Sequence, residues 1–198
     1  MGKYTVIAEV SQSILALLRN ELSPELIKKY EQINLCNPSK PEDVKVGIHL
    51  YDIQENSDFV QRNMIQKSNN ELQFPPQSLT LYYLITVYST ADRQSKAVDE
   101  QRILGRVMQI LGDHPRLENE ALVGSLQEAG ETFEIIRENM PYEDKIKLWQ
   151  FPNTPYQLSM VYKVQPVRLE STKTKPIKRV KDVSIELKGE DHEHKSSR

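Results

Sequence analysis

The chain has 198 residues, of which 38% are hydrophobic and 27% charged, enough apolar material for one globular domain with or without a tail. The net charge of −2 is unevenly spread, because residues 171–198 hold eight Lys/Arg and five Asp/Glu and so leave −5 for residues 1–170. An acidic body repels nucleic-acid phosphates, so we expect no nucleic-acid partner.

Nothing in the sequence indicates a membrane or a secreted context. No run approaches the roughly 18 consecutive apolar residues that a membrane span needs. Residues 1–4 lack the apolar block of a signal peptide. The single cysteine, Cys36, cannot form an internal disulfide and fits a reducing cytoplasm.

The first half of the chain predicts a helix followed by strands. Apolar residues at helical spacing predict an amphipathic helix over residues 4–22, which Ser23-Pro24 ends. Near-strict alternation predicts a strand over residues 44–53. Residues 56–78 are polar and predict a long surface loop or a loose hairpin. Residues 79–88 are rich in β-branched and aromatic side chains, which is typical of a strand covered on both faces.

The second half predicts a helix over residues 97–111 that ends at Gly112. Two short strands, residues 121–126 and 132–136, are expected to follow, separated by Gly130. Pro141 then begins a short helix, and residues 157–169 form a last long strand. This order predicts an α+β fold: a single domain with a mixed or mainly antiparallel sheet flanked by helices.

A search for catalytic or ligand-binding motifs finds none that is specific. The seven glycines are scattered and form no phosphate-binding loop, and Gly124-Ser125 lacks the second glycine of a nucleophile elbow. No two histidines have the spacing of a helical metal-ligand pair; they are His49, His114, His192 and His194. We therefore expect no catalytic residue, no cofactor and no metal, with a small enzyme of unrecognised site kept as an alternative.

Several segments, taken together in their order and spacing, resemble the cap or tail-terminator family of extracellular contractile injection systems. The resemblance spans residues 4–170. The segments that carry it are residues 48–56, Arg62-Asn63, Pro75-Pro76, residues 79–86, residues 100–109, Leu148-Trp149 and residues 155–164.

The resemblance implies a structural protein with the fold of phage tail terminators. It implies a homo-oligomeric ring, expected to be a hexamer, that sits on the last ring of the inner tube. There it would end tube growth and anchor the distal end of the sheath. The implied partners are the tube protein and the sheath protein, with no membrane partner. The alternative placement is a baseplate or neck adaptor of the same kind of particle. The protein would be cytoplasmic during assembly, and the particle released or membrane-anchored.

Two residues of the body are candidates for a subunit or sheath interface. Gly105 lies inside the second predicted helix, where glycine costs about 1 kcal/mol relative to alanine. This cost indicates that something approaches closely, either a packed element of the same chain or a neighbouring subunit. Tyr156 fits either the core or an interface, because interfaces favour tyrosine.

Residues 171–198 are expected to form a separate C-terminal arm or tail, partly disordered at its end, beyond a domain of residues 1–170. Apolar residues alternate with polar ones between 182 and 187, which predicts a strand with one buried face. The flank from 172 to 175 is polar and predicts a linker. The strand either folds back onto its own sheet or is donated to a neighbouring subunit or to the last sheath ring. The candidate interface residues of the tail are Ile177, Val180, Val183, Ile185 and Leu187.

Overall fold

The computed structural model describes residues 3–150 and 154–177. Within these residues the strands form two sheets, one of six strands in the order β1-β2-β5-β8-β7-β6 and one of three strands in the order β3-β4-β9. Only β1 and β2 pair in parallel, and the other pairs are antiparallel, which confirms the expected α+β fold with a mixed, mainly antiparallel sheet.

The strands of the large sheet are β1 (Ile33–Leu35), β2 (Val46–Glu55), β5 (Gln77–Val87), β8 (Ser159–Leu169), β7 (Thr132–Arg137) and β6 (Arg116–Glu118). Those of the small sheet are β3 (Ile65–Ser68), β4 (Glu71–Gln73) and β9 (Thr174–Pro176). The helices are α1 (Val6–Leu22), α2 (Lys96–Asp113), α3 (Ser125–Glu128) and α4 (Tyr142–Leu148), with 3-10 turns η1 (Tyr30–Gln32), η2 (Ser57–Phe59) and η3 (Asn119–Ala121).

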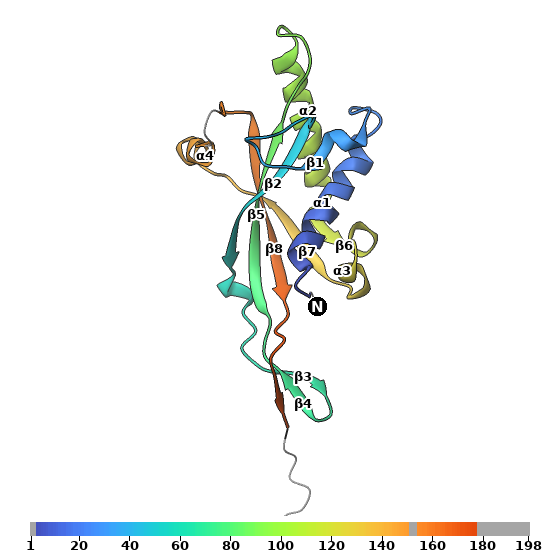
Figure 1. Cartoon of the computed structure of the whole chain (residues 1–198), viewed down its shortest axis with the longest axis vertical. Coiled ribbons are helices and arrows are strands. Elements are labelled where there is room, and N and C mark those ends of the chain that lie inside the picture. The colour runs from blue at the N-terminus through green and yellow to red at the C-terminus, as the bar shows by residue number, and fades with distance from the viewer. Residues whose placement is uncertain (1–2, 151–153, 178–198) are drawn as a thin grey trace, which may run out of the picture.

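The molecule consists of a compact head and a narrow arm (Figure 1). In the head, α1 and α2 cover one face of the large sheet, and their apolar side chains form the main core with β1, β2, β5, β7 and β8. On the other face, Trp149 at the end of α4 packs against Leu84 and Val161. The arm comprises the far ends of β2, β5 and β8 together with the small sheet. Because both faces of β5 are covered in the head, the strand is buried along most of its length, as the sequence predicted.

Helix α1 confirms the predicted amphipathic helix. Val6, Val10, Ile14 and Leu18 lie on its buried face, at the spacing that places them on one side of a helix. A buried hydrogen bond of 2.8 Å joins the hydroxyl of Ser11 to that of Tyr83 on β5. This pair satisfies two polar groups inside the core and so fixes α1 on the sheet.

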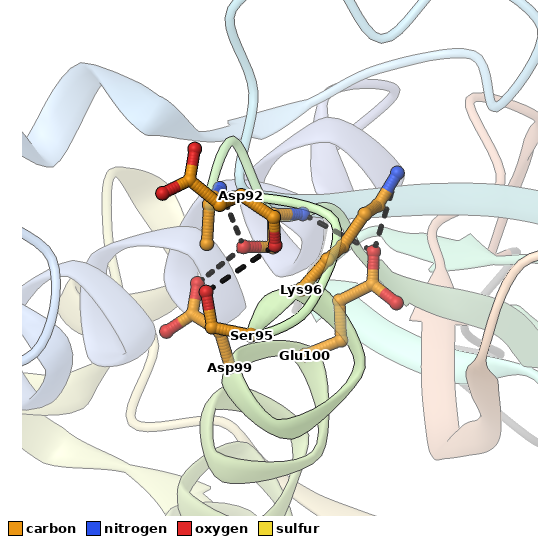
Figure 2. A network of polar contacts seen from close by, with 7 residues as sticks. Asp92, Ser95, Lys96, Asp99 and Glu100 are labelled. Atoms are coloured by element: carbon orange, nitrogen blue, oxygen red, sulfur yellow. Dashed lines mark hydrogen bonds and ion pairs between the residues drawn. The ribbon is translucent and has the colours of Figure 1, made fainter.

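The start of α2 is tied to the end of β5 by a polar network (Figure 2). The Ser89 backbone N–H donates to Glu100 Oε1 at 3.3 Å, and the Ser89 hydroxyl donates to Asp99. Acidic residues in a first helical turn are also favoured by the helix dipole. The prediction that Gly112 ends this helix was wrong, because α2 runs to Asp113. Pro115, two residues further on, prevents the helix from continuing.

The segment between α2 and β7 differs from prediction. Residues 121–126 do not form a strand, because Gly124 adopts a φ of +64° that breaks an extended chain. The carboxylate of Glu9 then accepts hydrogen bonds from the Ser125 hydroxyl at 2.8 Å and the Leu126 N–H at 3.2 Å, which holds α3 against α1. The strand that pairs with β7 is instead β6, whose three residues are too short to show alternation.

Candidate assembly surfaces

One buried asparagine connects all three strands that run from the head into the arm. Asn56 follows β2, and its backbone N–H donates to the Ser78 carbonyl at 2.7 Å. Its side-chain amide donates to Thr80 Oγ1 on β5 at 2.9 Å and to Gln165 Oε1 on β8 at 3.1 Å. The amide oxygen accepts from the Asp58 N–H at 3.0 Å. One side chain therefore links three strands at the neck of the arm.

The tip of the arm is a hairpin, as one of the two alternatives for residues 56–78 predicted. β9 adds to it as a third strand. The prediction of a linker over residues 172–175 was therefore wrong for residues 174 and 175, which belong to β9. The Phe74 N–H donates to the Lys173 carbonyl at 3.0 Å, and the Ile177 N–H donates to the Asn70 carbonyl at 2.8 Å. The Lys173 ammonium lies 4.8 Å from the centre of the Phe74 ring, a cation–π contact.

The candidate residues of the tail fall mostly outside the described part of the chain. Ile177 is half-buried and ends the segment bonded to the hairpin. Val180, Val183, Ile185 and Leu187 lie beyond the described residues. Two expectations stay predictions: that the domain ends at residue 170, and that residues 171–198 are a tail that reaches a neighbouring subunit or the sheath.

Tyr156 lies in an aromatic cluster beside α4. Its ring is 5.9 Å from the buried Trp149 ring and 6.0 Å from the exposed Tyr142 ring, both in edge-to-face geometry. The Trp149 indole N–H donates to Ser159 Oγ at 3.1 Å, which anchors the cluster to β8. Tyr156 is 41% exposed and Tyr142 64% exposed, so one face of the cluster is open to a partner. The interface role of Tyr156 stays a prediction.

Gly105 lies on the exposed outer face of α2. A Cβ built there would have no atom within 4 Å, so no described element of the chain packs closely against it. Of the two explanations for this glycine, the packed neighbour within the chain is excluded for the described residues. The subunit contact remains as a prediction.

The described residues offer no cluster suited to metal binding, and the Cys36 thiol is not activated. No group of three or more His, Cys, Asp or Glu within residues 3–150 and 154–177 could hold a metal ion. Burial, with a smaller contribution from Glu42, raises the pKa of the Cys36 thiol, which is the opposite of an activated thiolate. Burial lowers the pKa of His49. Over the same residues, no helix is long and apolar enough to cross a membrane.

Solved structures with this fold include two tube terminators. The PVC sheath/tube terminator of an extracellular contractile injection system, in its extended state, matches with a TM-score of 0.62 and 19% identity, over 93% of this chain and 64% of that one. The anti-feeding prophage cap, described as a tube terminating cap, matches with a TM-score of 0.59 and 17% identity, over 90% of this chain and 60% of that one. This chain thus spans less than two thirds of either protein.

Sequence comparison gives the family. A search of curated protein sequences finds no match to this chain. The Pvc16 N-terminal domain family matches residues 9–182, which extends past residue 170 into the predicted tail. The chain therefore belongs to the Pvc16 N-terminal domain family, and the resemblance to terminators of contractile injection systems is confirmed.

Proposed function

We propose that this protein caps the inner tube of a contractile, phage-tail-like injection particle. Copies of the chain assemble into a ring, expected to be a hexamer, on the last ring of the tube. The ring ends tube growth and anchors the distal end of the sheath. The observation that carries this proposal is the shared fold of the head and arm with two tube terminators, together with membership of the Pvc16 N-terminal domain family.

The shape of the molecule supports a role in assembly. A compact head with an arm built from continuous strands gives two separate contact surfaces on one subunit (Figure 1). The exposed aromatic cluster and the bare face of α2 around Gly105 lie on the head and offer further contacts. The action would be surface complementarity without catalysis, with tube and sheath proteins as partners and no nucleic acid or membrane. Assembly would take place in the cytoplasm.

Deletion of the gene tests this function. Particles from the deletion strain, imaged by negative-stain electron microscopy, should have tubes and sheaths of uncontrolled length, or should not form stably. Complementation with the intact gene is the control. Particles of uniform normal length would contradict the cap, and particles with a defective base and closed ends would place the protein at the baseplate or neck.

A further inference from the structure

In the part of the chain that the structure describes, three of the four sheet edges carry features that block pairing with another strand. At the β1 edge, the outward carbonyl of Ile33 accepts from Arg19 Nε at 2.9 Å, and the outward N–H of Leu35 donates to the side chain of Asn34 at 2.9 Å. Side chains thus occupy the backbone groups that an added strand would use. Such blocking is a common way to keep an edge strand from pairing.

The two edge strands of the small sheet, β9 and β3, are also poorly suited to pairing with a further strand. Pro176 faces outward from β9, since the neighbouring Ile177 N–H is the group that points at the hairpin, and proline has no N–H to donate. On the other side, β3 carries a register shift between Gln66 and Ser68. A bulge of this kind twists and interrupts an edge.

The β6 edge is short, with three residues, but within the described residues no side-chain hydrogen bond, bulge or outward-facing proline blocks it. The Ile135 N–H donates to the Pro115 carbonyl at 2.8 Å, and Leu117 pairs with Phe133. In an antiparallel ladder, the backbone groups of the alternate residues Arg116 and Glu118 therefore point away from β7. Since β6 is the terminal strand of the large sheet, these groups face no strand among the described residues.

The surface around β6 is strongly acidic. Residues 113–134 contain six Asp/Glu and one basic residue, Arg116, a sequence balance of −5, although one of the six, Glu131, is buried and paired with Arg168 at 3.6 Å. Arg116 is itself paired with Glu134 at 3.4 Å. Three carboxylates of this stretch are exposed: Glu118 on β6, Glu120 on η3 directly after it, and Glu128 at the end of α3.

The C-terminal tail has the matching chemistry. Residues 173–181 contain five Lys/Arg and no acidic residue, and the alternating segment 182–187 follows them directly. A strand that carries basic residues at one end complements an open edge lined by carboxylates. The 21 residues beyond Ile177 could span up to about 70 Å when extended, at about 3.3 Å each.

The direction of the chain favours an edge on another subunit. β8 and then β9 run from the head toward the tip of the arm, so the described chain ends at the tip, away from β6 of its own head (Figure 1). We propose that residues 178–187 of a second copy of this chain add as a strand to the β6 edge. This inference rests on the proposed ring and names the contact that closes it.

Cross-linking of full-length chains tests the contact. The variant carries Glu118→Cys and Val183→Cys in a Cys36→Ser background, and it is treated with a short bis-maleimide reagent in the presence of tube and sheath protein. We expect a ladder of covalent oligomers of this chain. The matched control combines Leu35→Cys at the blocked β1 edge with Val183→Cys and should stay monomeric. An internally cross-linked monomer, or a cross-link between Val183→Cys and the sheath protein, would overturn the inference.

A charge exchange provides the second test. Reversing the edge (Glu118, Glu120 and Glu128 to Lys) or the tail (Lys178, Arg179 and Lys181 to Glu) should weaken assembly at least about tenfold by mass photometry. Both reversals in one chain should restore it, because the charges again match. Rings that form in every variant with unchanged affinity would overturn the tail contact while leaving the cap function intact. Failure of the unmodified chain to form rings, even with tube protein, would overturn both.

Discussion

Asn56 forms hydrogen bonds to Ser78, Thr80, Gln165 and Asp58, yet its sequence context does not predict this role. Hydrophobic periodicity detects apolar faces and does not detect a buried polar residue that links strands. In the sequence, Asn56 simply begins a polar stretch. Only the fold brings Thr80 and Gln165, 24 and 109 residues away in the chain, to its amide group.

Replacing Asn56 by leucine should destabilise the protein. The substitution removes the amide that donates to both Thr80 and Gln165, which then keep only the 3.3 Å hydrogen bond from the Thr80 hydroxyl to Gln165 Oε1. Each hydrogen bond lost in this way costs about 0.5–1.5 kcal/mol. Urea denaturation should show this loss in the free energy of unfolding. The matched control is Asn69→Leu in the exposed hairpin turn, which should change it by less than about 0.5 kcal/mol. Equal stabilities of the two variants would show that the neck does not depend on this network.

Glu9 gives the fold a dependence on acid pH. Burial opposes the charged form, but hydrogen bonds from Thr5, Ser125 and Leu126 outweigh it and lower the pKa of Glu9 from its ordinary 4.5. A lowered pKa means that the charged carboxylate stabilises the fold above pH 4.5, and that this contribution is lost as the pH falls through the lowered value. Glu9→Gln should therefore be less stable than the unmodified protein at pH 7, with the difference shrinking by pH 3. A difference in unfolding free energy that is the same at both pH values would contradict this assignment.

At the level of helices and strands, long periodic segments were predictable and short ones were not. α1, β5 and β8 were predicted because each buries a continuous apolar pattern. The stretch from Gly112 to Glu128 was not, because its structure depends on one positive φ at Gly124 and on the distant carboxylate of Glu9. Such local turns are decided by contacts from elsewhere in the fold, which outweigh the propensity of six residues.

Two glycines of α2 separate a helix effect from an assembly effect. Gly105→Ala and Gly112→Ala each introduce a Cβ into open space, and each should raise the stability of the isolated chain by up to about 1 kcal/mol. If Gly105 lies at a subunit contact, only Gly105→Ala should also weaken ring formation, measured by mass photometry. Identical assembly of both variants would exclude Gly105 from the interface.

Truncation separates the head from the arm. A chain that ends after Glu170 lacks β9 and the Lys173 carbonyl, so hydrogen exchange should speed up in β3 and β4 while the head stays protected. A chain that ends after Ile177 keeps β9 and should retain slow exchange in the hairpin, while holding the sheath poorly. Unfolding of the head in the shorter chain would show that residues 171–177 belong to the core of the domain.

In the whole molecule, the division of charge was visible in the sequence, but its spatial arrangement was not. The excess of −5 in residues 1–170 matches the balance of residues 113–134 alone, and the fold places that stretch at an open sheet edge. The arm could not be predicted either, since its strands are the continuations of β2, β5 and β8 beyond the covered part of the sheet. Both features arise from tertiary structure, and both concern contact with other subunits.

The most direct measurement of the cap function is the length of tubes assembled in vitro. Purified tube protein should be polymerised with increasing amounts of this chain and the lengths measured by negative-stain electron microscopy. A cap binds only at tube ends, so we predict that mean length falls steeply at ratios far below one chain per tube subunit, with extra density at one end of each tube. Tube lengths that do not change even at an equal ratio, with no density at either end, would contradict the account.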